Sequence, residues 1–285
     1  MLHSNTDARS SKSHKPGKRA LLRNLWALRG ADQFEHIKPT HEGLRFGAVT
    51  NRGVQPQADV YLPAAQSEGT PSVMLIHGGG FLLGSRSMKP MRYLTSQLLA
   101  QGYAVCSIDY RLIFRGGRLE EAQQDARDGW RWWCEKSEEW SLDPEKRSIL
   151  GLSAGATLAY LTAVAPGQSS PQRLVCGFGL YNFASMNGSM GRLLPRLLTR
   201  SPDQRIWQGH SPLNAPHPDC PTLLLHGDAD QITAKEQSLA LATRRRELGL
   251  KTNTRIYPHA PHGFFNYCNE TSATAMEDIL RFLEE

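Results

Sequence analysis

The chain has 285 residues, of which 40% are hydrophobic and 21% charged, as in a globular protein with one large or two small domains. Its net charge of +6 lies in the first 30 residues, which hold seven basic residues and one acid. The rest of the chain is neutral overall, so the charge pattern excludes a basic nucleic-acid-binding face, and no nucleic acid is expected as a partner.

The five cysteines are scattered, and no two of them have C-x-x-C spacing. This pattern argues against a metal site or a redox motif, and it favours a reducing compartment. Residues 1–17 lack the apolar core of roughly 7–15 residues that a secretory signal needs, although an organelle transit peptide remains an alternative. No apolar run is long enough to span a membrane. We therefore expect a cytoplasmic protein with no metal and no stable membrane insertion.

The polar, basic residues 1–17 are predicted to form a disordered tail, followed by a single domain over residues 18–285. Residues 18–30 place apolar side chains at helical spacing. We interpret them as a helix that packs on the domain, with an active-site cap or a membrane-surface helix as alternatives.

Strands and helices alternate from residue 44 onward. The strands are expected at 44–50, 58–62, 72–76, 103–108, 147–152, 174–180, 222–225 and 253–257. Helices are expected at 91–101, 119–137, 154–165, 233–248 and 272–284, the fourth opened by a Thr233-x-x-Glu236 capping box. Asp143-Pro144 indicates a short turn. Residues 183–215 are too long for an ordinary connection, and we interpret them as an inserted cap or lid.

This alternation predicts an α/β fold with a mostly parallel sheet covered by helices on both faces. The chain's polar motifs each follow a predicted strand directly. Ligands of such sheets bind at the carboxyl ends of the strands, so the motifs are expected to meet at one edge.

The sequence Gly151-Leu152-Ser153-Ala154-Gly155 follows a predicted strand and precedes a helical pattern of small residues. This layout is typical of a nucleophile elbow, in which a serine lies on a sharp strand-to-helix turn. Glycines at both ends allow the strand and the helix to pack closely. Taken alone the motif also fits an ordinary turn, so the interpretation depends on partners elsewhere in the chain.

A nucleophilic serine needs a base, and the base needs an acid that orients it. His262 is the best candidate for the base because it lies in the loop after the last predicted strand, with His259 as its rival. Asp228 and Asp230 both follow the preceding strand. Asp230 is the better candidate for the acid because it stands further along the turn, where its carboxylate can reach His262, and Asp228 is the turn-forming alternative. The order Ser, Asp, His is that of an α/β-hydrolase.

His77-Gly78-Gly79-Gly80 follows another predicted strand. Its glycines leave backbone N–H groups open to a substrate oxygen. We expect Gly79, Gly80 and Ala154 to donate to an oxyanion, with His77 and Gly78 in support. A phosphate-binding loop is the alternative, but no Lys-Ser/Thr follows the glycines.

Taken together, the chain resembles the α/β-hydrolase superfamily, and within it the hormone-sensitive-lipase-like microbial carboxylesterases. The resemblance begins near residue 57 and is carried by residues 77–81, 109–112, 143–147, 151–155, 226–230 and 262–264. Leu152 and Ala156 stand where this family usually has Asp and Gly. The resemblance implies hydrolysis of carboxylic esters through an acyl-enzyme, without a metal or an organic cofactor.

We therefore expect a serine carboxylesterase that acts on small-molecule esters with short to medium acyl chains. Arylformamidase, sugar-ester deacetylase and peptidase activities are alternatives on the same triad. A non-catalytic ligand receptor on the same fold is the alternative from another class. The sequence leaves open whether residues 18–35 and 183–215 form one cap, and it predicts no particular oligomeric state.

Overall fold

The computed structural model describes residues 22, 27, 32–49, 54–65, 67–167, 169–186 and 188–285. Among these, eight strands form one sheet in the order β1-β2-β4-β3-β5-β6-β7-β8. The strands are β1 (His41–Arg45), β2 (Gln57–Tyr61), β3 (Thr70–Ile76), β4 (Ala104–Ile108), β5 (Leu142–Leu152), β6 (Arg173–Gly177), β7 (Thr222–Gly227) and β8 (Thr252–Tyr257). β2 is antiparallel to β1 and β4, and the other neighbours are parallel.

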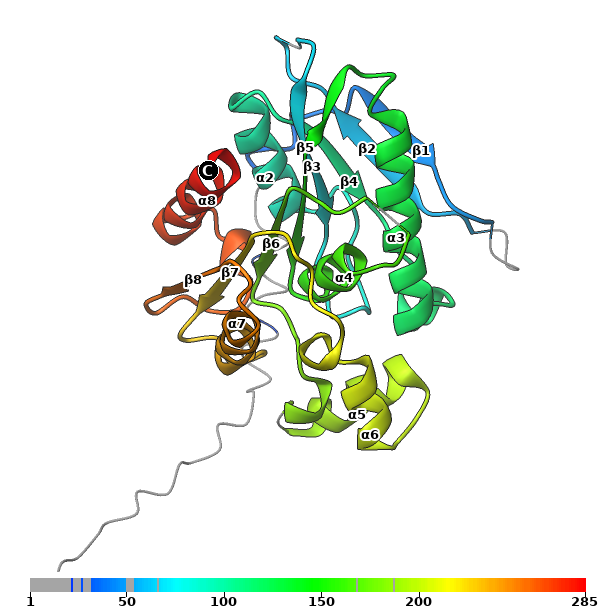
Figure 1. The fold of residues 1–285 in the computed structure, drawn as a ribbon, viewed down its shortest axis with the longest axis vertical. Helices are drawn as coiled ribbons and strands as arrows, with labels where there is room; N and C mark the ends of the chain where they lie inside the picture. The colour runs from blue at the N-terminus through cyan, green and yellow to red at the C-terminus, as the bar shows by residue number, and fades with distance from the viewer. Residues whose placement is uncertain are drawn as a thin grey trace, which may run out of the picture.

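Helices cover both faces of this sheet (Figure 1). The α-helices are α2 (Lys89–Ala100), α3 (Leu119–Lys136), α4 (Ala154–Ala163), α5 (Gly188–Thr199), α6 (Gln204–His210), α7 (Glu236–Glu247) and α8 (Glu270–Glu284). Short 3₁₀ turns are η1 (Ile113–Arg115), η2 (Phe183–Ser185), η3 (Pro212–Asn214) and η4 (Phe264–Asn266). The mostly parallel, doubly covered sheet that the sequence predicts is confirmed.

The middle strands carry apolar side chains on both faces because both faces are buried. In β3, Met74 and Ile76 belong to the core cluster that includes α3 and α4. Their neighbours Val73 and Leu75 belong to the opposite cluster, with α2 and α8. Side chains alternate along a strand, so a continuous apolar run is what a strand between two helical layers requires.

Two predicted strands end three or more residues earlier than expected. β1 stops at Arg45, and Phe46 turns into the core. β6 stops at Gly177 instead of 180, because Phe178 adopts a φ of 40° and its N–H donates to the carbonyl of Leu225 at 2.6 Å. This turn ends the strand at the same edge of the sheet as Ser153.

The predicted turn at Asp143-Pro144 lies within the bounds of β5. The ladder to β3 jumps from Leu142 to Arg147, so the intervening residues form an irregularity in the strand. Asp143 Oδ1 accepts the N–H of Glu145 at 2.9 Å, which stabilises a local turn there. The turn signal is therefore local, while the pairing on either side of it makes one long strand.

The predicted capping box at Thr233 is wrong. α7 begins at Glu236, its N-cap is Lys235, and no side chain caps it. The Thr233 hydroxyl contacts Asp230 and donates to the carbonyl of Phe178 instead. The hydroxyl that the local pattern assigned to the helix therefore bonds to the preceding turn and to the end of β6.

The segment 183–215 carries α5 and α6 between β6 and β7 (Figure 1). Leu194, Leu198 and Trp207 of this segment are buried in the same core cluster as α3 and α4. The segment is therefore packed onto the domain, while its role as a cap stays a prediction. The predicted tail and, apart from Leu22 and Ala27, the predicted helix 18–30 lie outside the described residues.

Candidate active site

Ser153 lies at the sharp turn between β5 and α4, with φ 53° and ψ −117°. The flanking glycines are needed for space. A Cβ on Gly151 would come within 2.1 Å of the carbonyl oxygen of Gly155, and one on Gly155 within 2.1 Å of that of Ile76. The elbow thus packs directly against the end of β3. The strained backbone conformation of Ser153 is maintained because both flanking glycines are in close contact with backbone atoms.

Hydrogen bonds fix this turn in the sheet. The N–H of Ser153 donates to the carbonyl of Gly177 at 2.8 Å, and its own carbonyl accepts from Ala156 and Thr157. The first turn of α4 therefore starts at Ser153. The positive end of the helix dipole lies beside its hydroxyl, which favours negative charge forming there.

The glycine loop after β3 lies against the elbow. A Cβ on Gly78 would be 3.2 Å from the Cβ of Ser153. Gly79 has a φ of 117° and Gly80 a φ of 62°, and the carbonyl of Gly79 accepts from Leu82 and Leu83. Within the described part of the chain, no acceptor pairs with the N–H of Gly80 or of Ala154.

The His77 side chain stabilises the glycine loop. Its Nδ1 lies 2.7 Å from the carbonyl oxygen of Gly78, and its ring stacks on Tyr110 with centroids 4.3 Å apart. Tyr110 donates its hydroxyl to the His77 carbonyl at 3.1 Å. Burial lowers the pKa of His77, so this ring is neutral at ordinary pH. It acts on the loop through packing and hydrogen bonds.

The structure brings Ser153, His262 and Asp230 into one hydrogen-bonded chain. Ser153 Oγ lies 2.9 Å from His262 Nε2, and His262 Nδ1 lies 2.7 Å from Asp230 Oδ2. The alternative acid and base, Asp228 and His259, take no part in this chain of hydrogen bonds. Asp228 accepts the backbone N–H of His259 at 2.6 Å, and both of these side chains face solvent.

The backbone around His262 explains its position. Gly263 adopts a left-handed conformation with φ 66° and ψ 34°, and the next two residues, Phe264 and Phe265, are fully buried. Phe178 meets the imidazole edge-on with centroids 5.1 Å apart. The buried Phe264 and Phe265 thus anchor the loop in the core, and the ring of Phe178 packs against the imidazole of His262.

Asp230 is fully buried and ionised. Burial by itself raises the pKa of a carboxyl group, but the charge of His262 and hydrogen bonds from His226 and His262 hold the pKa of Asp230 far below its usual range. The N–H groups of Ile232 and Thr233 donate to Oδ1 at 2.8 and 2.9 Å. Its negative charge is thus satisfied on both oxygens.

Sequence reasoning missed two side chains at this site, Thr233 and His226. Thr233 Oγ1 lies 3.2 Å from Asp230 Oδ2 and 3.1 Å from His262 Nδ1. His226 Nε2 lies 3.2 Å from the same Oδ2. The available signal was the spacing, since His226, Asp230 and Thr233 occupy one eight-residue stretch at the end of β7.

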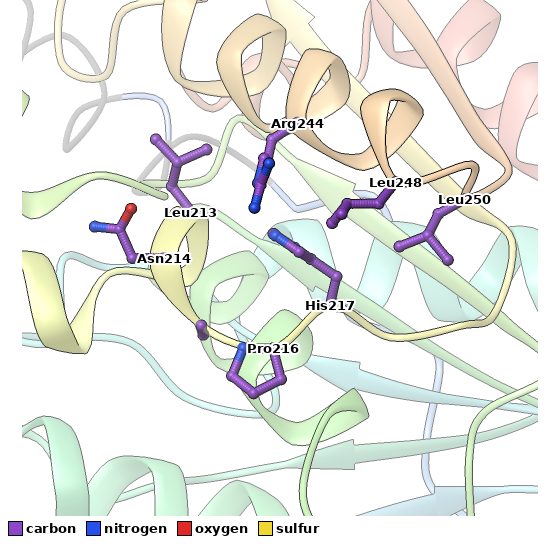
Figure 2. Close-up of a pocket in the computed structure, with 8 residues that line it drawn as sticks. Leu213, Asn214, Pro216, His217, Arg244, Leu248 and Leu250 are labelled. Carbon is purple, nitrogen blue, oxygen red and sulfur yellow. The ribbon is translucent and has the colours of Figure 1, made fainter.

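A cavity of about 580 Å³ lies between the η3 loop and the end of α7 (Figure 2). His217 and Arg244 point toward one another across it, with Leu213, Leu248 and Leu250 around them. These residues adjoin the amino ends of β7 and β8. The cavity therefore lies at the opposite edge of the sheet from Ser153.

Among the described residues, no group of three or more His, Cys, Asp and Glu side chains is placed to hold a metal ion. In the same part of the chain, no helix combines the length and the apolar character needed to cross a membrane.

The strand order, the two antiparallel strands at one edge and the elbow after β5 define the α/β-hydrolase fold. The chain belongs to the BD-FAE family, whose model matches residues 58–244. The resemblance to α/β-hydrolase esterases is thus confirmed. A structural relative is the hyperthermophilic esterase of Pyrobaculum calidifontis, with a TM-score of 0.75 and 23% identity over 93% of this chain and 90% of that one.

Two curated relatives are also similar. A non-reducing polyketide synthase of Stachybotrys bisbyi is 37% identical over 136 residues, or 44% of this chain. A probable isoprenylcysteine alpha-carbonyl methylesterase of Arabidopsis thaliana is 27% identical over 237 residues, or 74% of this chain. The chain spans 6% of the length of the first and 49% of the second.

Proposed function

We propose that this protein is a serine carboxylesterase that hydrolyses small carboxylic esters through an acyl-enzyme on Ser153. The observation that carries the proposal is the hydrogen-bonded chain from Ser153 through His262 to the buried Asp230. A serine hydroxyl becomes nucleophilic when a neighbouring base takes its proton as it attacks. Both distances in this chain are within direct hydrogen-bond reach.

In the first half-reaction, Ser153 Oγ attacks the ester carbonyl while His262 Nε2 takes the hydroxyl proton. The tetrahedral intermediate collapses, and His262 returns the proton to the departing alcohol. Water then enters, and His262 activates it to release the acid from the ester on Ser153. Asp230 stays ionised, holds the Nδ1–H tautomer of His262, and stabilises the imidazolium that forms.

The oxyanion would be stabilised by the N–H groups of Gly79, Gly80 and Ala154. The loop after β3 adjoins Ser153, and Ala154 is the first residue of α4, where the helix dipole also favours negative charge. Removing one such donor from an enzyme costs about 10²–10³ in kcat. This arrangement therefore supports acyl transfer as the reaction class.

The substrate range is proposed to be short- to medium-chain acyl esters with small alcohols. The segment 183–215, with its apolar side chains, follows the turn at Phe178 beside His262, and we propose that it borders an acyl pocket. The relative from Arabidopsis is named a methylesterase, which also points to a small alcohol.

The test is hydrolysis of p-nitrophenyl acetate, butyrate, octanoate and laurate by the wild type and by Ser153→Ala. The exposed Ser67→Ala serves as a matched control. We expect a rate optimum at short to medium chains, wild-type rates in Ser67→Ala, and a loss on the order of a million-fold in kcat for Ser153→Ala.

No hydrolysis of any ester by the folded wild type would contradict the proposal. Aryl formamides, acetylated sugars and peptides are then assayed with the same variants, because the same triad serves those reactions. Turnover of one of them would identify a related hydrolase. Ligand binding without turnover would identify a receptor on this fold.

A further inference from the structure

A second histidine lies directly behind the proposed triad. His226, next to last in β7, is fully buried. Its Nε2 is 2.8 Å from the carbonyl oxygen of Thr233 and 3.2 Å from Asp230 Oδ2. Its Nδ1 is 2.8 Å from the hydroxyl of Ser238 on α7. Both ring nitrogens are therefore engaged, and one of them faces the carboxylate that orients His262.

The partners of His226 determine where its proton lies. Nε2 faces two oxygens that only accept, the Thr233 carbonyl and the ionised Asp230, so Nε2 must carry hydrogen and donate. The Ser238 hydroxyl can donate to Nδ1 and complete a neutral ring. A buried neutral ring satisfied in this way avoids the cost of a second buried charge.

Asp230 Oδ2 is where these contacts meet. It accepts from His262 Nδ1 at 2.7 Å and lies within 3.2 Å of both His226 Nε2 and Thr233 Oγ1. Oδ1 is held by two backbone N–H groups of the following turn. With donors on each oxygen, the carboxylate plane is fixed. Oδ2 is thereby held toward Nδ1 of His262.

We propose that His226 is a positioning residue for the reaction: its Nε2–H holds Asp230 Oδ2 in line with His262 Nδ1, and Ser238 fixes the ring that does so. The inference rests on the proposed function of Ser153 as nucleophile. It extends the hydrogen-bonded chain from α7 to the elbow, in the order Ser238, His226, Asp230, His262, Ser153.

The competing interpretation is that His226 only fastens the turn after β7 through the Thr233 carbonyl. The two interpretations differ in what a leucine at this position does: if His226 only fastens the turn, folded His226→Leu is less stable but labels at the wild-type rate. The amide nitrogen of His226→Gln can take the place of Nε2 as donor to Asp230, whereas His226→Leu fills space and donates nothing.

The test measures how fast a fluorophosphonate probe labels Ser153 in the wild type, His226→Leu and His226→Gln. His217→Leu is the control, because His217, which is partly buried, is likewise bonded to a side chain but adjoins the far edge of the sheet. We expect labelling of His226→Leu to fall ten- to a hundredfold, as for loss of a hydrogen bond to a charged group. Labelling of His226→Gln stays within a few-fold of wild type, and that of His217→Leu is unchanged.

Labelling of His226→Leu within twofold of wild type overturns the inference. Equal loss in the leucine and glutamine variants, with equal melting temperatures, also overturns it. Hydrolysis of p-nitrophenyl acetate by the same variants adds a second readout: kcat falls while KM stays constant, because substrate does not touch His226.

A measurement on the unmodified protein covers the case in which the variants do not fold. In ¹⁵N-histidine NMR spectra at neutral pH, His226 is expected as the tautomer with hydrogen on Nε2. An Nε2 without hydrogen overturns the inference. The probe also separates this inference from the proposed function, because a protein that is labelled at Ser153 but hydrolyses no ester contradicts only the latter.

Discussion

At the scale of single residues, the close packing of the elbow requires that Gly155 has no Cβ atom. Gly155 is the second residue of α4, and any Cβ there would meet the carbonyl oxygens of Ile76 and His77 at 2.1 and 2.5 Å. Both obstacles are backbone atoms at the end of β3. No rotamer change relieves them, so the helix and the strand would have to move apart.

Gly155→Ala is therefore expected to lower the free energy of unfolding by about 3 kcal/mol or more, at the upper end of overpacking effects. It is also expected to abolish labelling of Ser153. Urea denaturation measures the first effect, and the fluorophosphonate probe measures the second. Gly209→Ala in α6 is the control, since no atom of the described residues outside its own helix backbone lies within 4 Å of its Cβ position, and alanine favours helix by about 1 kcal/mol. Equal stability of Gly155→Ala and wild type would contradict the close packing of the elbow.

At the scale of elements, the first turn of α7 joins two parts of the site. Gln237 accepts the N–H groups of Tyr181 and Asn182 at 2.9 and 2.7 Å. Its amide donates to the carbonyl of Asn182 and to the hydroxyl of Ser185. The next residue, Ser238, binds His226 behind Asp230. One helical turn thus holds both the start of the segment 183–215 and the acid of the proposed triad.

Gln237→Leu is expected to release the start of this segment, because the N–H groups of Tyr181 and Asn182 lose their acceptor. Each buried group left unsatisfied costs about 1–3 kcal/mol. We expect faster hydrogen exchange at the amides of Tyr181 and Asn182 than in the wild type. Gln204→Leu, at an exposed position in α6, is the control and should leave these amides unchanged. Protection equal to wild type in Gln237→Leu would show that the segment is held by its apolar contacts alone.

At the scale of the whole molecule, the sheet gathers residues that are far apart in sequence. Ser153, Asp230 and His262 follow β5, β7 and β8, which are parallel, so all three lie at one edge. The buried charge of Asp230 is therefore stabilised only in the folded protein, and folding is linked to its ionisation.

The sign of this linkage follows from the depressed pKa of Asp230. In the unfolded chain this carboxyl group has a normal pKa of about 3.9. The stabilising contribution is fully present above that pH and is lost as the pH falls toward the lower pKa of the folded protein. We expect the free energy of unfolding, measured with urea from pH 7 to pH 2, to fall more steeply below about pH 4 in the wild type than in Asp230→Asn. At pH 7 the variant is less stable by about 2 kcal/mol, the value of a hydrogen bond to a charged group. Parallel curves for the two proteins would contradict the linkage.

Local sequence determines much of this fold. The alternation of strands and helices, the elbow around Ser153 and the glycine loop after β3 all depend on neighbours within a few residues, and motif and periodicity report them directly. Asp230 and His262 were predicted because both follow strands of a parallel sheet. Their hydrogen bonds agree with that prediction, while their catalytic roles stay a proposal.

Only the tertiary structure decided how polar side chains are shared. Thr233 matches a capping pattern, yet its hydroxyl contacts Asp230 in the preceding turn and donates to the carbonyl of Phe178, which becomes available only when β6 and β7 lie side by side. His226 ends a strand in the sequence, and only folding places its ring under Asp230. Backbone conformation follows from local sterics. The competition of one hydroxyl or one ring nitrogen among several partners depends on distances that exist only in the packed molecule.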